Sequence, residues 1–282
     1  MCLVEAGGDY DHRQRTIREL GFLTCRRGRL GHDVAASIVG VRTTAEELQH
    51  EFYTATAEQY HAAFVRPNDE HYRALSIISS LIDGLLYRSV LDVGAGTGRG
   101  VKHLVDRHPG TEVRGVEPVR AMIDHAERAR GVPAGCILEA RGEALPFADA
   151  SFDAVCELGI LHHVRDPNAI VREMTRVARR AVFLSDENRF ARGGRFSRAS
   201  KYALHRLGLW RAVTLARTHG RGYLLTEGDG GVAYSYSVYD SLPALDGWAD
   251  HVFLVPTVPS QVGWFHPLFS ATHILVCALR DV

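Results

Sequence analysis

The chain has 282 residues, of which 46% are hydrophobic, and it carries 33 basic and 33 acidic side chains. This length and apolar content suffice to bury the core of a globular protein. Because the charges balance, no overall field attracts nucleic acid or an anionic membrane. The N-terminus lacks a basic start followed by a long apolar run, and no segment reaches the length of a membrane span, so we expect a cytoplasmic protein.

The five cysteines form no C-x-x-C pair, and their number is odd. A disulfide framework and a zinc ribbon are therefore not indicated, and we expect reduced thiols.

Hydrophobic periodicity predicts alternating helices and strands through most of the chain. Residues 1–50 show no sustained period until a helix start near Thr44. The later helical patterns are 52–64, 71–87, 101–107, 120–130 and 167–180. The strand patterns are the apolar start of 90–100, followed by 112–117, 136–140, 152–159 and 181–188. Such alternation with short joints predicts a parallel sheet with helices on both faces.

The remainder of the chain changes character. Residues 189–221 carry nine Arg or Lys and no Asp or Glu, a pattern that fits a cationic lid or, slightly better, a solvated helical face. Residues 228–240 alternate tyrosines after turn glycines and predict a strand or hairpin with one aromatic face. Residues 252–256 and 273–280 are strand-like, and their joint, which holds Trp264 and Phe265, is too short for a helical crossover. We expect these two strands to pair antiparallel at the sheet edge.

The glycine cluster after the first strand, V-L-D-V-G-A-G-T-G over 90–98, predicts a sharp strand-to-helix turn that a ligand approaches closely. A dinucleotide site would place a third glycine at 99 or 101, where Arg99 and Val101 stand. Asp92 precedes the turn, and a carboxylate there suits a cationic ligand better than a pyrophosphate.

Glu117 ends the second strand, where a carboxylate can accept both hydroxyl groups of a ribose. Met122 follows on the next helix and could contact a purine face, although core packing explains it nearly as well.

Four segments in this order resemble the class I S-adenosylmethionine-dependent methyltransferases, closest to the subgroup of ubiquinone and menaquinone biosynthesis. They are VLDVGAGTG (90–98), GVEP (115–118) with Met122, EALPFADASFDAV (143–155) and LGILHHVRDP (158–167). The resemblance implies a Rossmann-like fold with a mostly parallel seven-stranded sheet, helices on both faces and an antiparallel edge strand. It also implies S-adenosylmethionine as the cofactor.

By that resemblance, the methionine part lies against the glycine turn, the ribose against Glu117 and the adenine near Met122. The implied cofactor-binding residues are Asp92, Gly94, Ala95, Gly96, Gly98, Glu117, Pro118, Met122, Gly142, Glu143, Cys156, Glu157, Leu158 and Tyr60. Many relatives bind the adenine amino group with an Asp where this chain has Arg141. Arginine accepts no hydrogen bond. Either Glu143 accepts the hydrogen bond of the amino group, or the amino group donates to water.

Two residues are candidates for chemistry. His162 could act as a general base if the acceptor loses a proton, although His-His is usual here in this subgroup whatever the acceptor. Glu157 could orient the cofactor or bind a substrate amine, and a place in the cofactor wall without a chemical part explains it equally well. Tyr60 resembles an aromatic residue that covers the cofactor, and plain packing also accounts for it. Asp166 before Pro167 matches an N-cap.

The segment C-R-R-G-R-L-G-H-D-V (25–34) resembles half of a small zinc-ribbon module found ahead of some methyltransferases. With Cys2, Cys25, His12 and His32 a zinc site is conceivable, but a metal-free remnant is favoured. We therefore expect no metal.

We predict an N-terminal extension over 1–50, a methyltransferase core over 51–188, an insertion over 189–250 that caps the acceptor site, and the final core strands over 251–282. The predicted function is methyl transfer to a small-molecule acceptor, such as those of specialised metabolism. An RNA methyltransferase and a non-catalytic cofactor-binding subunit are the alternatives, and a dehydrogenase ranks below both. The oligomeric state and the methylated atom are open.

Overall fold

A computed structural model of the protein describes residues 44–226, 231–258 and 267–281. The four side chains considered for zinc, and the pair Trp264 and Phe265, lie outside these ranges. None of the helices in the described ranges combines the length and apolarity that crossing a membrane requires.

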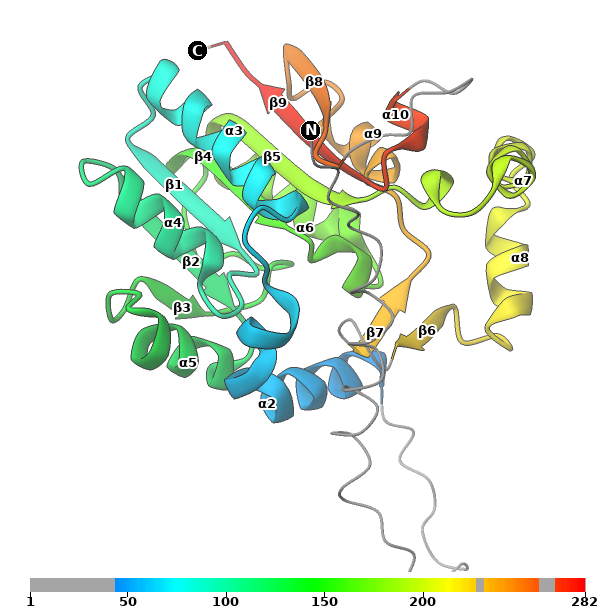
Figure 1. Ribbon diagram of the computed structural model, residues 1–282. Helices are drawn as coiled ribbons and strands as arrows, with labels where there is room; N and C mark the ends of the chain where they lie inside the picture. Colours follow the sequence, from blue (N-terminus) through cyan, green and yellow to red (C-terminus); the bar gives the residue numbers. More distant parts are fainter. Residues whose placement is uncertain (1–43, 227–230, 259–266, 282) are drawn as a thin grey trace, which may run out of the picture. The chain divides into compact units, whose positions relative to one another are not determined.

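The centre of the fold is a seven-stranded sheet with the strand order β3-β2-β1-β4-β5-β9-β8 (Figure 1). Its strands are β1 (Ser89–Val93), β2 (Glu112–Glu117), β3 (Ile137–Glu139), β4 (Phe152–Leu158), β5 (Ala178–Glu187), β8 (His251–Pro256) and β9 (His273–Leu279). The first five pair in parallel, whereas β9 pairs antiparallel with both β5 and β8. The predicted sheet and its antiparallel edge pairing are confirmed.

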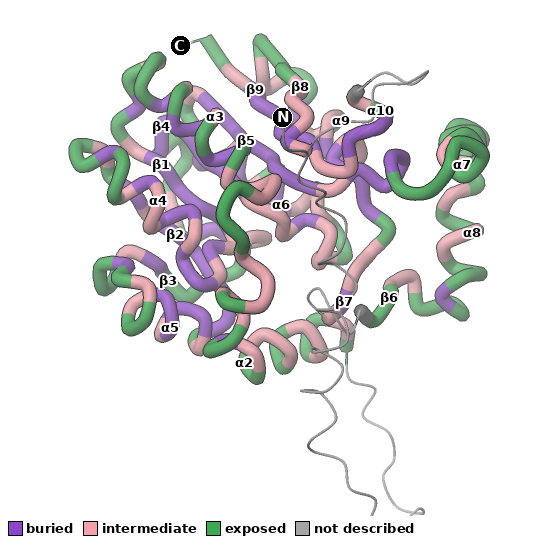
Figure 2. The backbone as a smooth tube through the Cα atoms, viewed as in Figure 1, coloured by how far each residue is buried: buried purple, intermediate pink, exposed green. Residues whose placement is uncertain are grey.

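Helices cover both faces of this sheet. One face packs against α3 (Glu70–Gly84), α4 (Arg99–Arg107) and α5 (Arg120–Arg130), and the other against α6 (Pro167–Val177) and α9 (Leu242–Leu245). Neighbouring residues of a strand point to opposite faces, so Val90 joins the first cluster and Leu91 the second. Figure 2 shows the resulting buried sheet between partly exposed helices.

Local signals set several helix ends. The Asp166 carboxylate accepts a hydrogen bond from the backbone N–H of Ala169 at 3.2 Å, which confirms the predicted N-cap before Pro167. Gly131 ends α5 with a φ of 68°, in the left-handed region that glycine tolerates.

The boundary between α6 and β5 differs from the prediction. The helix was expected to reach residue 180, yet it ends at Val177 and the strand begins at Ala178. Ala178 pairs with Phe152 in the sheet, and Arg179 donates to Asp153 Oδ1 at 2.6 Å. These contacts with β4 outweigh the helical preference of the Ala-Arg-Arg segment.

The segment after β5 holds two helices and a hairpin. Its elements are η2 (Arg189–Ala191), α7 (Arg195–Arg206), α8 (Trp210–Arg217), β6 (Tyr223–Thr226), β7 (Gly231–Tyr234) and η3 (Val238–Ser241). Neither α7 nor α8 has a buried residue, which the tube in Figure 2 makes plain. Within the described part of the predicted range 228–240, the strand that forms is β7, over Gly231–Tyr234, and its hairpin partner β6 lies before that range. Tyr236 lies buried beyond the end of β7.

One further helix precedes the sheet. Helix α2 (Ala45–Phe64) contacts α5 and the hairpin strand β7. Among the described cysteines, Cys136, Cys156 and Cys277 are free thiols.

Candidate functional site

The glycine turn connects β1 to α4 at the carboxyl end of the sheet. Gly94, Gly96 and Gly98 have φ values of 73°, 54° and 78°, a region that side chains with a Cβ disfavour. A Cβ at Gly94 would lie 2.5 Å from Ile160 Cγ2, and one at Gly98 would lie 2.6 Å from Val132 Cγ2, whereas a Cβ at Gly96 meets nothing within 4 Å. Packing thus requires the outer two glycines, and the middle one faces open space.

That open space is a cavity of about 570 Å³, here called the loop cavity. It is lined by Tyr53, Tyr60, Val65, Asp92, Gly94, Ala95, Gly96, Thr97, Arg99, Gly100, Glu117, Met122, Leu158, Gly159 and Ile160. Residues from the ends of β1, β2 and β4 therefore meet in one place, as expected where parallel strands end.

Glu117 is bonded to the glycine turn itself. Its Oε2 accepts from the backbone N–H of Gly96 at 2.9 Å, and its Oε1 accepts from Val119 N–H at 3.0 Å. Burial raises the pKa of Glu117 to about 7, although both backbone bonds act to lower it.

Asp92 is the second buried carboxylate of the loop cavity. Burial raises its pKa to about 7, against the attraction of the Arg99 guanidinium. The Cys156 thiol donates to Asp92 Oδ1 at 3.9 Å. Two buried acids with elevated pKa values in one cavity favour a ligand that brings positive charge and hydroxyl donors.

A second cavity of about 820 Å³, here called the strand-end cavity, adjoins the first. Tyr53, Gly94, Glu117 and Ile160 line both. The other residues of the strand-end cavity are Glu46, Gln49, His50, Pro118, Val119, Arg141, Gly142, Glu143, His163, Val164, Arg165 and Ile170. The two cavities therefore adjoin at these four shared residues, which include Glu117.

The structure brings most of the predicted cofactor residues to this space. Asp92, Gly94, Ala95, Gly96, Glu117, Met122, Leu158 and Tyr60 line the loop cavity, and Pro118, Gly142 and Glu143 line the strand-end cavity. Gly98, Cys156 and Glu157 line neither. Gly98 serves the packing of the turn, and Cys156 touches the cavity only through Asp92.

Glu157 is fully buried and supports the cavity from behind. Its Oε2 accepts from Gly159 N–H at 3.0 Å and from Ile160 N–H at 3.1 Å, and both of these residues line the loop cavity. Burial, and then the neighbouring Asp186 carboxylate, raise the pKa of Glu157 well above its usual range. Glu157 therefore holds the residues after β4 in place through these two hydrogen bonds.

Sequence reasoning missed Tyr53 and Arg99 as cavity residues. Tyr53 lies two helical turns before Tyr60 on α2, and their ring centroids are 5.5 Å apart. Helical spacing from Tyr60 could have identified it. Arg99 begins α4 directly after the turn, and its Nη1 donates to Asp69 Oδ2 at 2.7 Å. No sequence signal links Asp69 to Arg99, because the contact depends on how α3 packs.

His162 and His163 follow β4 in the short helix η1 (Leu161–His163). His162 Nδ1 donates to Asp186 Oδ1 at 2.7 Å, and His163 Nδ1 donates to the carbonyl of Val232 at 2.7 Å. These bonds fix the tautomers, so Nε2 of each neutral ring carries the lone pair.

The environments of the two rings separate their pKa values. Burial lowers the pKa of His162, but the charge and hydrogen bond of Asp186 outweigh burial and leave it above its usual value. Burial, and then His162, lower the pKa of His163 to about 3. His163 is therefore neutral, while His162 is hydrogen-bonded through Nδ1 to the Asp186 carboxylate.

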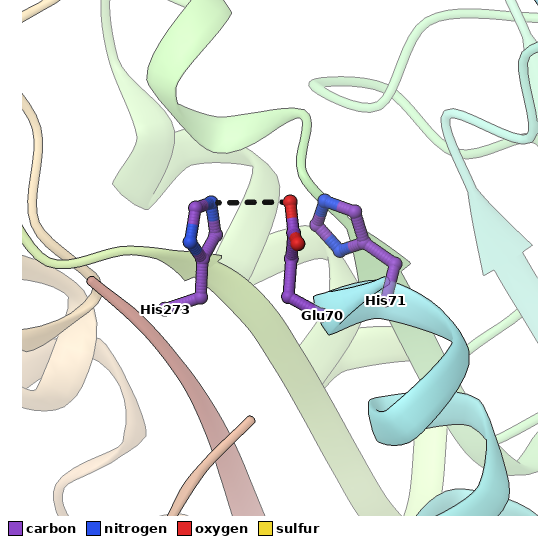
Figure 3. Close-up of side chains that lie close together, drawn as sticks. All are labelled: Glu70, His71 and His273. Atoms are coloured by element: carbon purple, nitrogen blue, oxygen red, sulfur yellow. Dashed lines mark ion pairs between the residues drawn. The ribbon is translucent and has the colours of Figure 1, made fainter. Parts of the chain in front are cut away.

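Figure 3 shows a separate cluster formed by Glu70, His71 and His273. Their potential ligand atoms lie within 4.8 Å of one another, as in sites that hold a metal ion. Glu70 Oε1 lies 3.7 Å from His273 Nε2, and His71 Nδ1 lies 3.2 Å from Ser185 Oγ. None of the three lines the loop cavity or the strand-end cavity.

Comparison with known proteins agrees with this geometry. Residues 91–184 match a family model described as a methyltransferase domain. The O-methyltransferase resE of Aspergillus sclerotiorum is 34% identical over 94 residues, which are 32% of this chain and 35% of that protein. An uncharacterised methyltransferase of Mycobacterium sp. (strain KMS) is 43% identical over 93 residues, which are 33% of this chain and 35% of the relative. The match thus spans about a third of the length of these relatives.

A solved structure supports the fold over a longer range. Magnesium protoporphyrin IX methyltransferase from Synechocystis PCC 6803, solved with bound S-adenosylmethionine, superposes with a TM-score of 0.53 at 14% identity. The superposition covers 86% of this chain and 100% of that one. Residues 91–184 are thus similar to a methyltransferase domain, and the chain has the Rossmann-like fold of that solved methyltransferase.

Proposed function

We propose that the protein transfers a methyl group from S-adenosylmethionine to a small-molecule acceptor. The observation that carries this proposal is the joint position of Asp92 and Glu117 in the loop cavity, beside the open face of Gly96. Asp92 would face the cationic methionine part, and Glu117 would accept the ribose hydroxyls. When bound, the cofactor supplies an activated methyl group on a positively charged sulfur.

The same residues disfavour a dinucleotide. Arg99 stands at the place of the third glycine and lines the cavity, and the Asp92 carboxylate lines the same cavity beside the glycine turn, where a pyrophosphate would lie. Like charges in a buried site repel a diphosphate.

The adenine would lie in the strand-end cavity, against Pro118, Gly142 and Glu143. Arg141 Nη2 pairs with Glu46 Oε2 at 3.0 Å and lies 3.6 Å from Glu143 Oε1. Glu143 is the acidic side chain of the 141–143 turn in this cavity. We infer that it accepts the hydrogen bond of the adenine amino group, as the Asp does in many relatives.

The subgroup and the methylated atom are inferred from similarity to other methyltransferases. The four sequence motifs favour the subgroup of ubiquinone and menaquinone biosynthesis, and the relative named as an O-methyltransferase favours oxygen as the methylated atom. The aromatic residues of 189–250 support an aromatic acceptor, as in specialised metabolism. The balanced charge of 33 basic and 33 acidic side chains disfavours RNA.

Calorimetric titration of the full chain with S-adenosylmethionine, S-adenosylhomocysteine and NAD tests the cofactor. We expect the first two to bind and NAD to give no heat of binding. Binding of NAD in place of the other two would overturn the assignment. Retained cofactor affinity without methyl transfer to any acceptor tried would point to the non-catalytic subunit.

A further inference from the structure

A third cavity lies between η1 and the insertion and has a volume of about 1100 Å³. His162, His163 and Glu187 form the side that belongs to the core. The insertion supplies the rest, namely Arg189, Arg192, Lys201, Trp210, Thr214, Arg217, Thr218, Gly222, Tyr223, Leu224, Ala233, Tyr234, Ser235 and Tyr236. We call this space the insertion cavity.

The basic run of residues 189–221 is not one uniform solvated face. Four of its nine cations, Arg189, Arg192, Lys201 and Arg217, line the insertion cavity. Two of the four have carboxylate partners, because Arg189 Nη2 donates to Asp240 Oδ1 at 2.7 Å and Arg192 pairs with Glu187.

For the other two cations, the described residues supply no such partner. Lys201 Nζ donates to the carbonyl oxygens of Arg189 and Arg192 at 3.0 and 2.8 Å. Within the described ranges, no carboxylate lies within ion-pair distance of Lys201 or Arg217. Burial, and then the repulsion of Arg192 and Arg217, lower the pKa of Lys201. The cavity therefore holds an excess of positive charge that an anionic ligand would neutralise.

Aromatic rings form the walls between these cations. The ring centroids of Tyr223 and Tyr234 are 5.9 Å apart, and Trp210 Nε1 donates to Ser235 Oγ at 3.0 Å. The Arg189 guanidinium carbon lies 5.4 Å from the centroid of Trp210, which holds this ring in place. Aromatic walls suit a planar ligand.

The insertion cavity reaches the catalytic end of the sheet. His163 lines both this cavity and the strand-end cavity, and its ring lies 3.9 Å from that of His162. Because Asp186 occupies Nδ1 of His162, Nε2 is the nitrogen left for a ligand in the insertion cavity.

We propose that the insertion cavity binds a planar aromatic acceptor that carries a carboxylate and a hydroxyl group, with Lys201 and Arg217 at the carboxylate and His162 Nε2 at the hydroxyl. This inference rests on the proposed methyl transfer. The hydroxyl proton moves to His162 Nε2, and the oxygen forms its bond to the methyl carbon of the cofactor. The carbon–sulfur bond breaks, and its electron pair leaves sulfur neutral.

A binding experiment tests the anion site without requiring methyl transfer. The full chain is titrated with fluorescent hydroxynaphthoate and with hydroxynaphthamide, which has the same ring and hydroxyl without the charge. We expect the carboxylate to bind at least tenfold more tightly. Arg217→Gln should weaken the binding of hydroxynaphthoate about tenfold and leave the binding of hydroxynaphthamide unchanged.

Arg211→Gln provides the matched control, since Arg211 belongs to the same helix α8 but does not line the cavity. It should alter neither affinity. Equal affinities of the two probes for the unmodified chain, or equal losses in the Arg217 and Arg211 variants, would overturn the proposal. So would a single-stranded RNA that displaces the probe and depends equally on both arginines, because that result assigns the run to nucleic acid.

Calorimetry with S-adenosylmethionine on the same variants separates this inference from the proposed function. The cofactor affinity should not change in the Arg217 variant. If the cofactor binds and hydroxynaphthoate does not, only the acceptor assignment fails.

Discussion

The carboxylate of Glu117 accepts a hydrogen bond from the backbone N–H of Gly96, at 2.9 Å from Oε2. One side chain thus joins the end of β2 to the turn after β1 before any ligand arrives. A ligand that replaces this N–H with its own hydroxyl donors finds the acceptor already oriented, which reduces the ordering cost of binding.

Gly96 is the position where a side chain would enter the cavity without disturbing the packing. We expect Gly96→Arg to abolish binding of S-adenosylmethionine while the protein stays folded, because no atom lies within 4 Å of the added Cβ. Calorimetry and circular dichroism measure the two effects. Gly135→Arg is the matched control, since Gly135 also has open space and a positive φ, of 75°, yet lines none of the three cavities. Unreduced affinity in the Gly96 variant would contradict the loop assignment.

Cofactor affinity should rise with pH. The pKa values of Asp92 and Glu117 are both raised by burial to about 7. Below that pH the carboxyls are protonated and lose their charge, and above it they attract the cation and accept the ribose hydroxyls. Each acid contributes up to about tenfold between about pH 6 and about pH 8, so we expect the affinity to increase up to about a hundredfold. Calorimetric titrations across this range test the sign, and Glu117→Gln should reduce the increase to the roughly tenfold contribution of Asp92. An affinity that falls with rising pH would refute this role of the two acids.

The support that Glu157 gives to the cavity wall can be tested with two variants. Glu157→Gln keeps an oxygen acceptor for the N–H groups of Gly159 and Ile160, so cofactor affinity should stay within about twofold. Glu157→Ala removes the acceptor from these two part-buried N–H groups, at a cost of up to about 1–3 kcal/mol each, and should weaken binding at least tenfold. Thermal unfolding accompanies the titrations. Equal behaviour of the two variants would show that the hydrogen bonds do not matter.

His162→Ala should lower turnover by about 10²–10⁴-fold, the usual contribution of a general base. Cofactor affinity should be unchanged, because His162 lines only the insertion cavity of the three. A base must be neutral, so kcat/KM rises with pH through the pKa of His162, which Asp186 holds above its usual value. Asp186→Asn removes that attraction and should move the rising limb to lower pH. An unaffected rate in the alanine variant would remove His162 from the chemistry.

Removal of metal ions should not change the rate. Glu70, His71 and His273 are the three described side chains gathered as a potential ligand set, and none of them lines the insertion cavity, the loop cavity or the strand-end cavity. Turnover before and after dialysis against EDTA measures this, with total metal analysis of the protein as the control. A loss of activity that zinc restores would place an ion in this cluster.

Sequence patterns predicted the elements whose limits depend on local chemistry. The strand of residues 112–117 and the helix of residues 120–130 have the predicted limits, because a glycine, a proline or a charged cluster lies beside each end. The end of α6 could not be predicted, since the pairing of Ala178 with Phe152 depends on tertiary contact.

The same division holds for the site. The roles of Asp92, Glu117 and the glycines could be predicted from their spacing, because all of them belong to one unit of strand, helix and strand. The contacts of His162 with Asp186 and of Arg189 with Asp240 join residues 24 and 51 positions apart. Only the packed fold brings these pairs together, so a single sequence could not assign the cations of residues 189–221 to a cavity.

Because α7 and α8 bury none of their residues, substitutions on these helices remove little packing from the hydrophobic core. Evolution can therefore remodel this wall of the insertion cavity, where we propose that the acceptor binds, while the core of the fold keeps its stability. Related enzymes with the same donor site and different substrates are expected to diverge first in these two helices.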